Sequence, residues 1–272
     1  MTHDLDPAIA AERTRVQEQV QGRTLVHYLA DTAREHADQP AYSDRHQAPE
    51  DQSWRTLTWA ETRERALDVA AGLMAHGVQR GDTVAIMASN RIEHFLADMG
   101  AVHAAATPMS IYNTLSPEQV AYVAGHARPV AVVLESPDHR ARWEKAMAEV
   151  DSITKVVMLG EDWDTLVAEG AAYRAEHPGA VEERAAELTP DSPATILYTS
   201  GTTGNPKGVV LTHHNVLYEA MSTQAQAGLV DGVGDQARLA KPIRLAALSS
   251  GSGLEADSNN HAPALFQMNT GQ

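Results

Sequence analysis

Apolar residues follow two kinds of spacing along most of the chain. Between residues 25 and 33, leucine, valine and alanine recur at helical intervals, and this helix should end near the turn at Pro40. Two short strand-like stretches follow at residues 41–42 and 54–57, separated by the charged loop RHQAPEDQ. This order predicts a helix followed by a hairpin.

Cap residues mark the start of two further helices. Thr58 and Glu61 form a capping box, and the helix that they open should reach Gly77, a residue suited to a C-cap. Ser116 and Pro117 give a second cap signature, with the proline at the first helical position. The inner face of the first of these helices should carry Ala66, Val69, Ala70, Leu73 and Met74.

Short, continuous apolar runs alternate with helical segments further along the chain. The runs at residues 83–87, 130–134 and 155–159 are typical of strands buried on both faces, as in parallel sheets. Helical segments at about 92–104 and 140–150 lie between or beside them. The alternation predicts a layered α/β fold in which helices flank a mostly parallel sheet.

The last patterned part of the chain holds a helix, two strands and another helix. The charged, alanine-rich stretch 165–187 should form a surface helix, and residues 194–198 and 208–212 should form strands around a Gly/Ser/Thr-rich loop. A helix should begin at His213. Beyond Leu229 no periodicity is sustained, so we expect a disordered tail. The expected domains are an N-terminal arm at 1–22, an α/β domain at 23–229 and a divergent tail at 230–272.

Composition narrows the kinds of function. The 272 residues carry 21 Lys and Arg against 36 Asp and Glu, a net charge of -15, which disfavours nucleic acid and anionic membranes as main partners. The absence of cysteine excludes disulfides, thiolate metal sites and a cysteine nucleophile. The acidic N-terminal stretch does not resemble a secretory signal, and no apolar run approaches the roughly 20 residues of a membrane-spanning helix. We therefore expect a cytoplasmic protein, for which peripheral membrane contact stays open.

The loop YTSGTTGNPKG at residues 198–208 carries the chemistry. Its glycines let the backbone approach a ligand closely, and its hydroxyls stand beside a run of backbone N–H groups suited to phosphate oxygens. Lys207 adds a positive charge on a flexible stem, and Pro206 stiffens the turn before it. The candidate phosphate-binding residues are Thr199, Ser200, Gly201, Thr202, Thr203, Gly204 and Lys207.

Two other interpretations of this region are weaker. The P-loop of common NTPases needs glycine before the lysine and a helix after it, whereas here Pro206 precedes Lys207 and a strand should follow. A hydrolase nucleophile at Ser200 would need glycine where Tyr198 stands. His213 and His214 are adjacent, which favours a structural or helix-capping role over metal binding, and we predict no metal site.

The loop resembles the signature of the adenylate-forming superfamily, which includes acyl-CoA synthetases, nonribosomal adenylation domains and luciferases. Residues Thr199–Gly208 match the family pattern Thr-Ser-Gly-Thr-Thr-Gly-x-Pro-Lys-Gly at every specified position. The likeness extends over residues 23–229, through Leu57–Glu61 and Arg80–Asp82. The stretch Tyr112–Thr114 is similar to the long-chain fatty acyl-CoA synthetase branch.

The resemblance implies an ATP-dependent acid–thiol ligase. Such enzymes use ATP and Mg²⁺ to turn a fatty acid into an acyl-adenylate, and then pass the acyl group to coenzyme A. The β- and γ-phosphates would be held by Ser200, Thr202, Thr203 and Lys207, which would stabilise the leaving pyrophosphate. Two alternatives remain: a non-catalytic remnant that acts as an interaction fragment, and an adenylating enzyme for a different acid.

The resemblance also has gaps. The family's Tyr-Gly-x-Thr-Glu segment, ribose-binding Asp, hinge Arg and C-terminal Lys have no match after Leu229, so the catalytic residues stay unassigned. We therefore expect the incomplete, N-terminal part of the adenylate-forming fold, inactive alone, with a tail at 230–272 that arose from a frameshift, early stop or rearranged gene. Such a chain should be poorly soluble or bind a partner that covers its exposed apolar faces.

Overall fold

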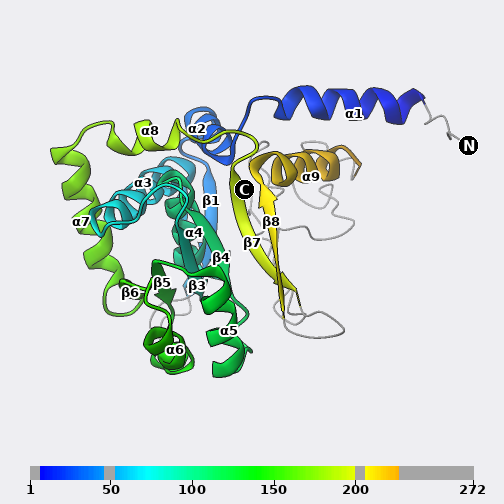
Figure 1. The fold of residues 1–272 in the computed structure, drawn as a ribbon. Coiled ribbons are helices and arrows are strands. Elements are labelled where there is room, and N and C mark those ends of the chain that lie inside the picture. Colours follow the sequence, from blue (N-terminus) through cyan, green and yellow to red (C-terminus); the bar gives the residue numbers. More distant parts are fainter. Residues whose placement is uncertain (1–6, 46–52, 200–205, 227–272) are drawn as a thin grey trace, which may run out of the picture.

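A four-stranded parallel sheet lies at the centre of the protein (Figure 1). The computed structural model describes residues 7–45, 53–199 and 206–226. The strand order is β4-β3-β5-β6, so β3 is an inner strand, and all five of its residues are buried. The strands are β3 (Thr83–Met87), β4 (Thr107–Ser110), β5 (Ala131–Leu134) and β6 (Lys155–Met158). The predicted mostly parallel sheet and its three apolar strands are confirmed.

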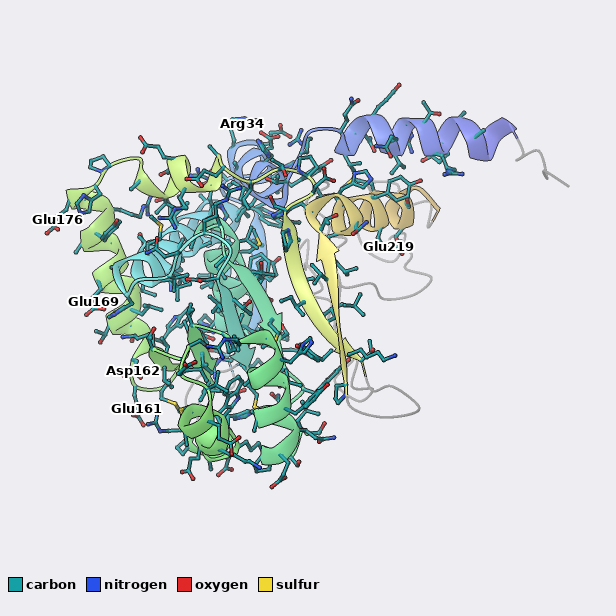
Figure 2. All side chains as sticks on the ribbon, viewed as in Figure 1. Arg34, Glu161, Asp162, Glu169, Glu176 and Glu219 are labelled. Atoms are coloured by element: carbon teal, nitrogen blue, oxygen red, sulfur yellow. The ribbon has the colours of Figure 1, made fainter. Side chains whose placement is uncertain are left out.

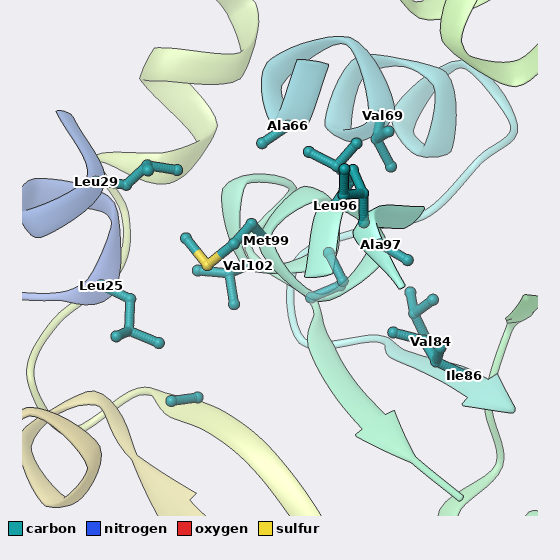
Figure 3. Packing of buried hydrophobic residues seen from close by; sticks show 14 of the residues in the cluster. Leu25, Leu29, Ala66, Val69, Val84, Ile86, Leu96, Ala97, Met99 and Val102 are labelled. Atoms are coloured by element: carbon teal, nitrogen blue, oxygen red, sulfur yellow. The ribbon is translucent and has the colours of Figure 1, made fainter. Parts of the chain in front are cut away.

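Helices cover both faces of this sheet, because alternate strand residues point to opposite sides. Val84 and Ile86 of β3 join a cluster with α2, α3 and α4 (Figure 3). Ala85 and Met87 join a second cluster, with α5 and α6. This division produces the three layers expected of an α/β fold. The helices are α2 (Leu25–Glu35), α3 (Trp59–Ala75), α4 (Ile92–His103), α5 (Pro117–Ala127) and α6 (Pro137–Glu149).

The predicted helix caps form as expected. Thr58 Oγ1 accepts the backbone N–H of Glu61 at 3.2 Å, and the Glu61 carboxylate accepts the backbone N–H of Thr58 at 2.8 Å. Ser116 caps α5 in the same way, with Pro117 at its first position. Gly77 follows α3 with a φ of +90°, a value that favours glycine after a helix. These helix ends could be predicted from the sequence because their caps are hydrogen bonds between residues that are close together along the chain.

The stretch predicted as one surface helix forms two, α7 (Trp163–Glu176) and α8 (Ala180–Ala185). Charged residues of α7 such as Glu169 and Glu176 project outward (Figure 2). Its other face is in close contact with α3: Leu166 is buried, and a Cβ atom at Gly170 would overlap the carbonyl oxygen of Asp68. The expectation of a surface helix was therefore right for one face only.

Strand β4 was not predicted from the sequence. It contains Pro108, which cannot donate a ladder hydrogen bond and therefore weakens a strand pattern. The proline is tolerated because β4 pairs with β3 alone among the described strands. On the other side of β4, Thr195 Oγ1 donates a hydrogen bond to the carbonyl oxygen of Pro108 at 3.3 Å.

Two antiparallel pairs accompany the sheet. The predicted hairpin is present as β1 (Pro40–Asp44) with β2 (Arg55–Thr58). The second pair, β7 (Pro193–Thr199) with β8 (Lys207–Thr212), leads directly into α9 (His213–Gln226), as predicted. Within the described part of the chain, no helix is both long and apolar enough to cross a bilayer.

The N-terminal arm is largely helical and packs onto the rest of the protein. Helix α1 (Pro7–Val20) runs beside α9 (Figure 1). Val16 and Val20 are buried in the same cluster as Val216 and Leu217 of α9. The arm therefore adds apolar contacts to the domain that the residue pattern assigned to 23–229.

Candidate functional site

The two described ends of the candidate phosphate loop are the last residue of β7 and the first residue of β8. In the antiparallel register Tyr198 is opposite Gly208, and Thr199 is opposite Lys207. The two ends of the loop are therefore neighbours across the ladder. Of the seven predicted phosphate-binding residues, the structure brings Thr199 and Lys207 together. The other five lie outside the described residues: Ser200, Gly201, Thr202, Thr203 and Gly204.

Both described loop ends are accessible to a ligand. Thr199 and Lys207 have exposed side chains. Among the described residues, no carboxylate lies within ion-pair distance of the Lys207 ammonium, which leaves that charge available for an anion. The segment after Lys207 is a strand, which agrees with the rejection of the common P-loop. The arrangement suits an anionic ligand held at a hairpin tip.

Tyr198 anchors the base of this loop. Its side chain is 6% exposed and belongs to the cluster formed with α5 and α6. Its ring lies against Gly208, where an added Cβ would be 3.1 Å from the tyrosine Cζ. Burial raises the pKa of the Tyr198 hydroxyl, and nearby Tyr122 raises it further. The hydroxyl therefore stays protonated and able to donate.

His126 of α5 holds that hydroxyl. Its Nδ1 lies 2.6 Å from the Tyr198 oxygen, and the two rings meet edge to face at a centroid distance of 5.8 Å. The residues are 72 positions apart in sequence. Sequence reasoning missed His126, because a lone histidine near the end of a helix gives no local signal of a distant partner.

His213 and His214 begin helix α9 directly after β8, and His213 makes a structural contact. His213 is fully buried, and its Nδ1 accepts the backbone N–H of Leu25 at the start of α2 at 3.3 Å. Burial, together with the smaller effect of the nearby His27 and His103, lowers the pKa of His213 to about 4. No group of three or more His, Cys, Asp or Glu side chains among the described residues could hold a metal ion. The hydrogen bond from Leu25 to His213 supports the predicted capping role.

A second polar cluster lies beyond the carboxyl ends of β3 and β5, where open α/β sheets often bind ligands. Arg55 contacts both Asp44 and Glu93, at 2.7 Å and 2.5 Å. Burial alone would raise the pKa of Glu93, but hydrogen bonds from Arg55 and Arg91 outweigh burial and hold the pKa at about 2. Arg91 also reaches Glu135, at 3.4 Å.

Glu135 completes this network by accepting the backbone N–H of Ser89 at 2.5 Å and its hydroxyl at 2.9 Å. The charged groups of the network thus pair with one another rather than point toward an unoccupied space. We conclude that the cluster joins the β1–β2 hairpin to the sheet, and that the β7–β8 loop is the better candidate site.

Comparisons with known proteins point to the same loop-bearing fold. A family model described as AMP-binding enzyme matches residues 29–246. The long-chain-fatty-acid–CoA ligase FadD15 of Mycobacterium bovis is 32% identical over 176 residues, which make up 63% of this chain and 29% of that protein. The peroxisomal long chain acyl-CoA synthetase 7 of Arabidopsis thaliana is 32% identical over 184 residues, or 64% of this chain and 26% of that protein.

Solved structures share the architecture. The crystal structure of a long-chain-fatty-acid-CoA ligase, FadD1, from Archaeoglobus fulgidus superposes with a TM-score of 0.65 at 20% identity, covering 76% of this chain and 40% of that chain. At this identity the likeness concerns the fold alone. The chain thus spans 29% of the length of the Mycobacterium bovis relative that it matches.

Proposed function

Because the chain belongs to the AMP-binding enzyme family, we propose that its β7–β8 loop binds the phosphates of ATP during activation of a long-chain fatty acid. The observation that carries the proposal is the pairing of exposed Thr199 and Lys207 at the two ends of the Thr199–Gly208 signature. The names of the relatives support the acid class.

The proposed reaction has two steps. A carboxylate oxygen of the fatty acid attacks the α-phosphorus of ATP, and the bond from that phosphorus to the bridging oxygen breaks, releasing pyrophosphate. The thiolate of coenzyme A then attacks the acyl carbonyl carbon, and AMP leaves. In the first step negative charge builds on the pyrophosphate, which positioned donors and a cation stabilise.

This chain would contribute to the first step. Lys207 would place its ammonium against the β- and γ-phosphate oxygens, and the hydroxyl of Thr199 would stand beside it. The hydroxyls of Ser200, Thr202 and Thr203 are proposed to donate to the same oxygens.

Titration with ATP by calorimetry tests the proposal. Lys207→Ala removes the cation, and we expect the affinity to fall about 10- to 100-fold, since a charge-assisted hydrogen bond contributes about 1.5–3 kcal/mol. Lys145→Ala removes an equally exposed lysine on α6 and should leave the affinity unchanged. Equal affinities for the Lys207→Ala variant and the unaltered chain would exclude this role for the loop.

The substrate class is tested separately. ATP–pyrophosphate exchange would be measured with a long-chain fatty acid, an aryl acid and an amino acid. Exchange that depends on the fatty acid supports the proposed ligase. Exchange with another acid would identify a different adenylating enzyme, and ATP binding without exchange would identify a nucleotide-binding chain that does not complete activation.

A further inference from the structure

Tyr198 joins the base of the phosphate loop to the main body of the protein. Tyr198 is the last residue before the signature begins, and its buried ring packs in the cluster with α5 and α6. A ring held in this way limits the backbone freedom of Tyr198, which is bonded directly to Thr199. We therefore expect the contacts of Tyr198 to restrain Thr199, the first residue of the signature.

Besides the packing of its ring in that cluster, three specific contacts hold Tyr198. Its backbone pairs with Gly208 on β8, and its ring lies over that glycine, which has no side chain to displace it. Its hydroxyl meets His126 Nδ1 at 2.6 Å. The first two contacts lie within the β7–β8 pair, whereas the third joins the pair to helix α5.

The third contact is the one at the loop end of β7. Among the described residues, side-chain hydrogen bonds join β7 to the sheet layer at Thr195 and at Tyr198. Thr195 lies nearer the start of the strand and bonds to Pro108 of β4. The pair formed by His126 and Tyr198 thus holds the ribbon immediately before the loop.

We propose that His126 is a positioning residue for ATP binding, which acts through Tyr198 to hold the paired ends of the phosphate loop, Thr199 and Lys207, in a binding-ready orientation. The inference rests on the proposed ATP role of the loop. A loop already held in its bound orientation loses less freedom when the ligand arrives, so its affinity is higher.

Two substitutions remove this hydrogen bond from opposite sides. Tyr198→Phe keeps the ring over Gly208 and deletes the hydroxyl, and His126→Leu deletes the imidazole. We expect each to weaken ATP binding about 5- to 10-fold, as for the loss of one hydrogen bond. Because both act on the same contact, the double variant should be no weaker than either single variant.

Rescue and matched controls separate positioning from general damage. His126→Asn places an amide close to where Nδ1 lies and should keep most of the affinity. Tyr112→Phe removes the hydroxyl of an exposed tyrosine outside α5 and should leave the ATP affinity unchanged. Additive losses in the double variant, or an asparagine variant as weak as the leucine variant, would overturn the proposal.

Hydrogen exchange without nucleotide provides an independent readout. Backbone amides of Thr199, Lys207 and Gly208, at the paired ends of the loop, should exchange faster in Tyr198→Phe and His126→Leu than in the unaltered chain, while amides of β3 stay protected. If the unaltered chain fails to bind ATP but this pattern appears, the proposed function fails and the positioning role stands. If exchange in the loop is unchanged, the positioning role fails whatever the affinities show.

Discussion

The Nδ1 atom of His213 lies 3.3 Å from the backbone nitrogen of Leu25 and accepts its hydrogen. This bond requires a neutral imidazole with its proton on Nε2, because a protonated Nδ1 could not accept. His103 has the opposite arrangement, since its Nδ1 donates to the carbonyl oxygen of Met99 at 2.7 Å. Both rings are buried, so the folded protein favours two neutral histidines.

We predict that mild acid destabilises the fold through this pair. Burial lowers the pKa of His103 to about 4 and that of His213 to about 4, against an ordinary value of 6.5. The unfolded chain therefore binds more protons between pH 6.5 and 4, and the free energy of unfolding should fall as the pH drops through that window. Each group adds a slope of up to about 1.4 kcal/mol per pH unit.

Urea unfolding at a series of pH values measures this slope. His213→Asn keeps an acceptor near Leu25 but cannot be protonated, so the slope between pH 6.5 and 4 should decrease. The charged and titratable groups around the pair include His27, Arg63 and Glu182, and all are retained in this variant. His177→Asn changes an exposed histidine as the control. An unaltered slope in His213→Asn would contradict the prediction.

Removing the charge of Glu93 from the network should lower the free energy of unfolding. Glu93→Gln removes the carboxylate that pairs with Arg55 and Arg91 and leaves two partly buried guanidinium groups less well paired. We expect a loss of about 3 kcal/mol in the free energy of unfolding at neutral pH. Glu144→Gln, at an exposed position of α6, should cost little. The difference would be read from urea midpoints, and equal midpoints would refute it.

The lowered pKa of Glu93 predicts a second loss of stability at lower pH. The pKa of Glu93 is about 2 in the folded protein, against 4.5 as its ordinary value. Its contribution to stability is complete above about pH 4.5 and is lost as the pH falls toward 2. In Glu93→Gln the fall in stability over this lower window should be smaller, which separates it from the histidine effect at higher pH.

Two helical glycines should respond oppositely to alanine. At Gly170 on α7 a methyl group would overlap the backbone of Asp68 on α3, so Gly170→Ala should lower the free energy of unfolding by about 1–3 kcal/mol. At Gly125 on α5 no atom lies near the position of an added Cβ, so Gly125→Ala should raise it by about 0.5–1 kcal/mol. Thermal melts compare the two, and a stabilised Gly170→Ala would refute the close contact.

We predict that strand β8 promotes self-association of the protein. Val209 and Val210 are 43% and 53% exposed on a strand whose one described partner is β7. Val210→Lys should reduce self-association, because a charge on such a strand opposes edge-to-edge pairing. Light scattering after gel filtration measures the change. Ala141→Lys adds the same charge at an exposed position of α6 and should not help; equal improvement in both variants would indicate net charge rather than β8.

Short-range rules predicted much of this fold from the sequence. The capping boxes at Thr58 and Ser116 and the buried run at 83–87 need only neighbouring residues, and all three are present as expected. The rest depends on distant contacts. Pro108 weakens the strand pattern of β4, so its pairing with β3 was not predicted. The residues around Gly170 give no sign that the backbone of Asp68 lies against it.

The candidate site likewise has one part that the sequence predicts and another that it does not. The signature placed Thr199 and Lys207 in one loop, and the antiparallel register of β7 and β8 brings them together. His126 could not be inferred, because its partner Tyr198 is 72 residues away and contributes a hydroxyl that tyrosine carries anywhere. Sequence patterns thus indicate which loop to propose for ATP binding, whereas the structure shows that His126 contacts the tyrosine at its base.

The bond from Leu25 to His213 also determines how late in synthesis α2 can make its final contacts. The two residues are 188 positions apart, so the first turn of α2 leaves the ribosome long before its cap is made. At roughly 5–20 residues per second, that delay is roughly 10–40 s. Throughout this interval the apolar faces of α1 and α2 lack α9, and nascent chains are open to chaperone binding until translation has passed residue 213.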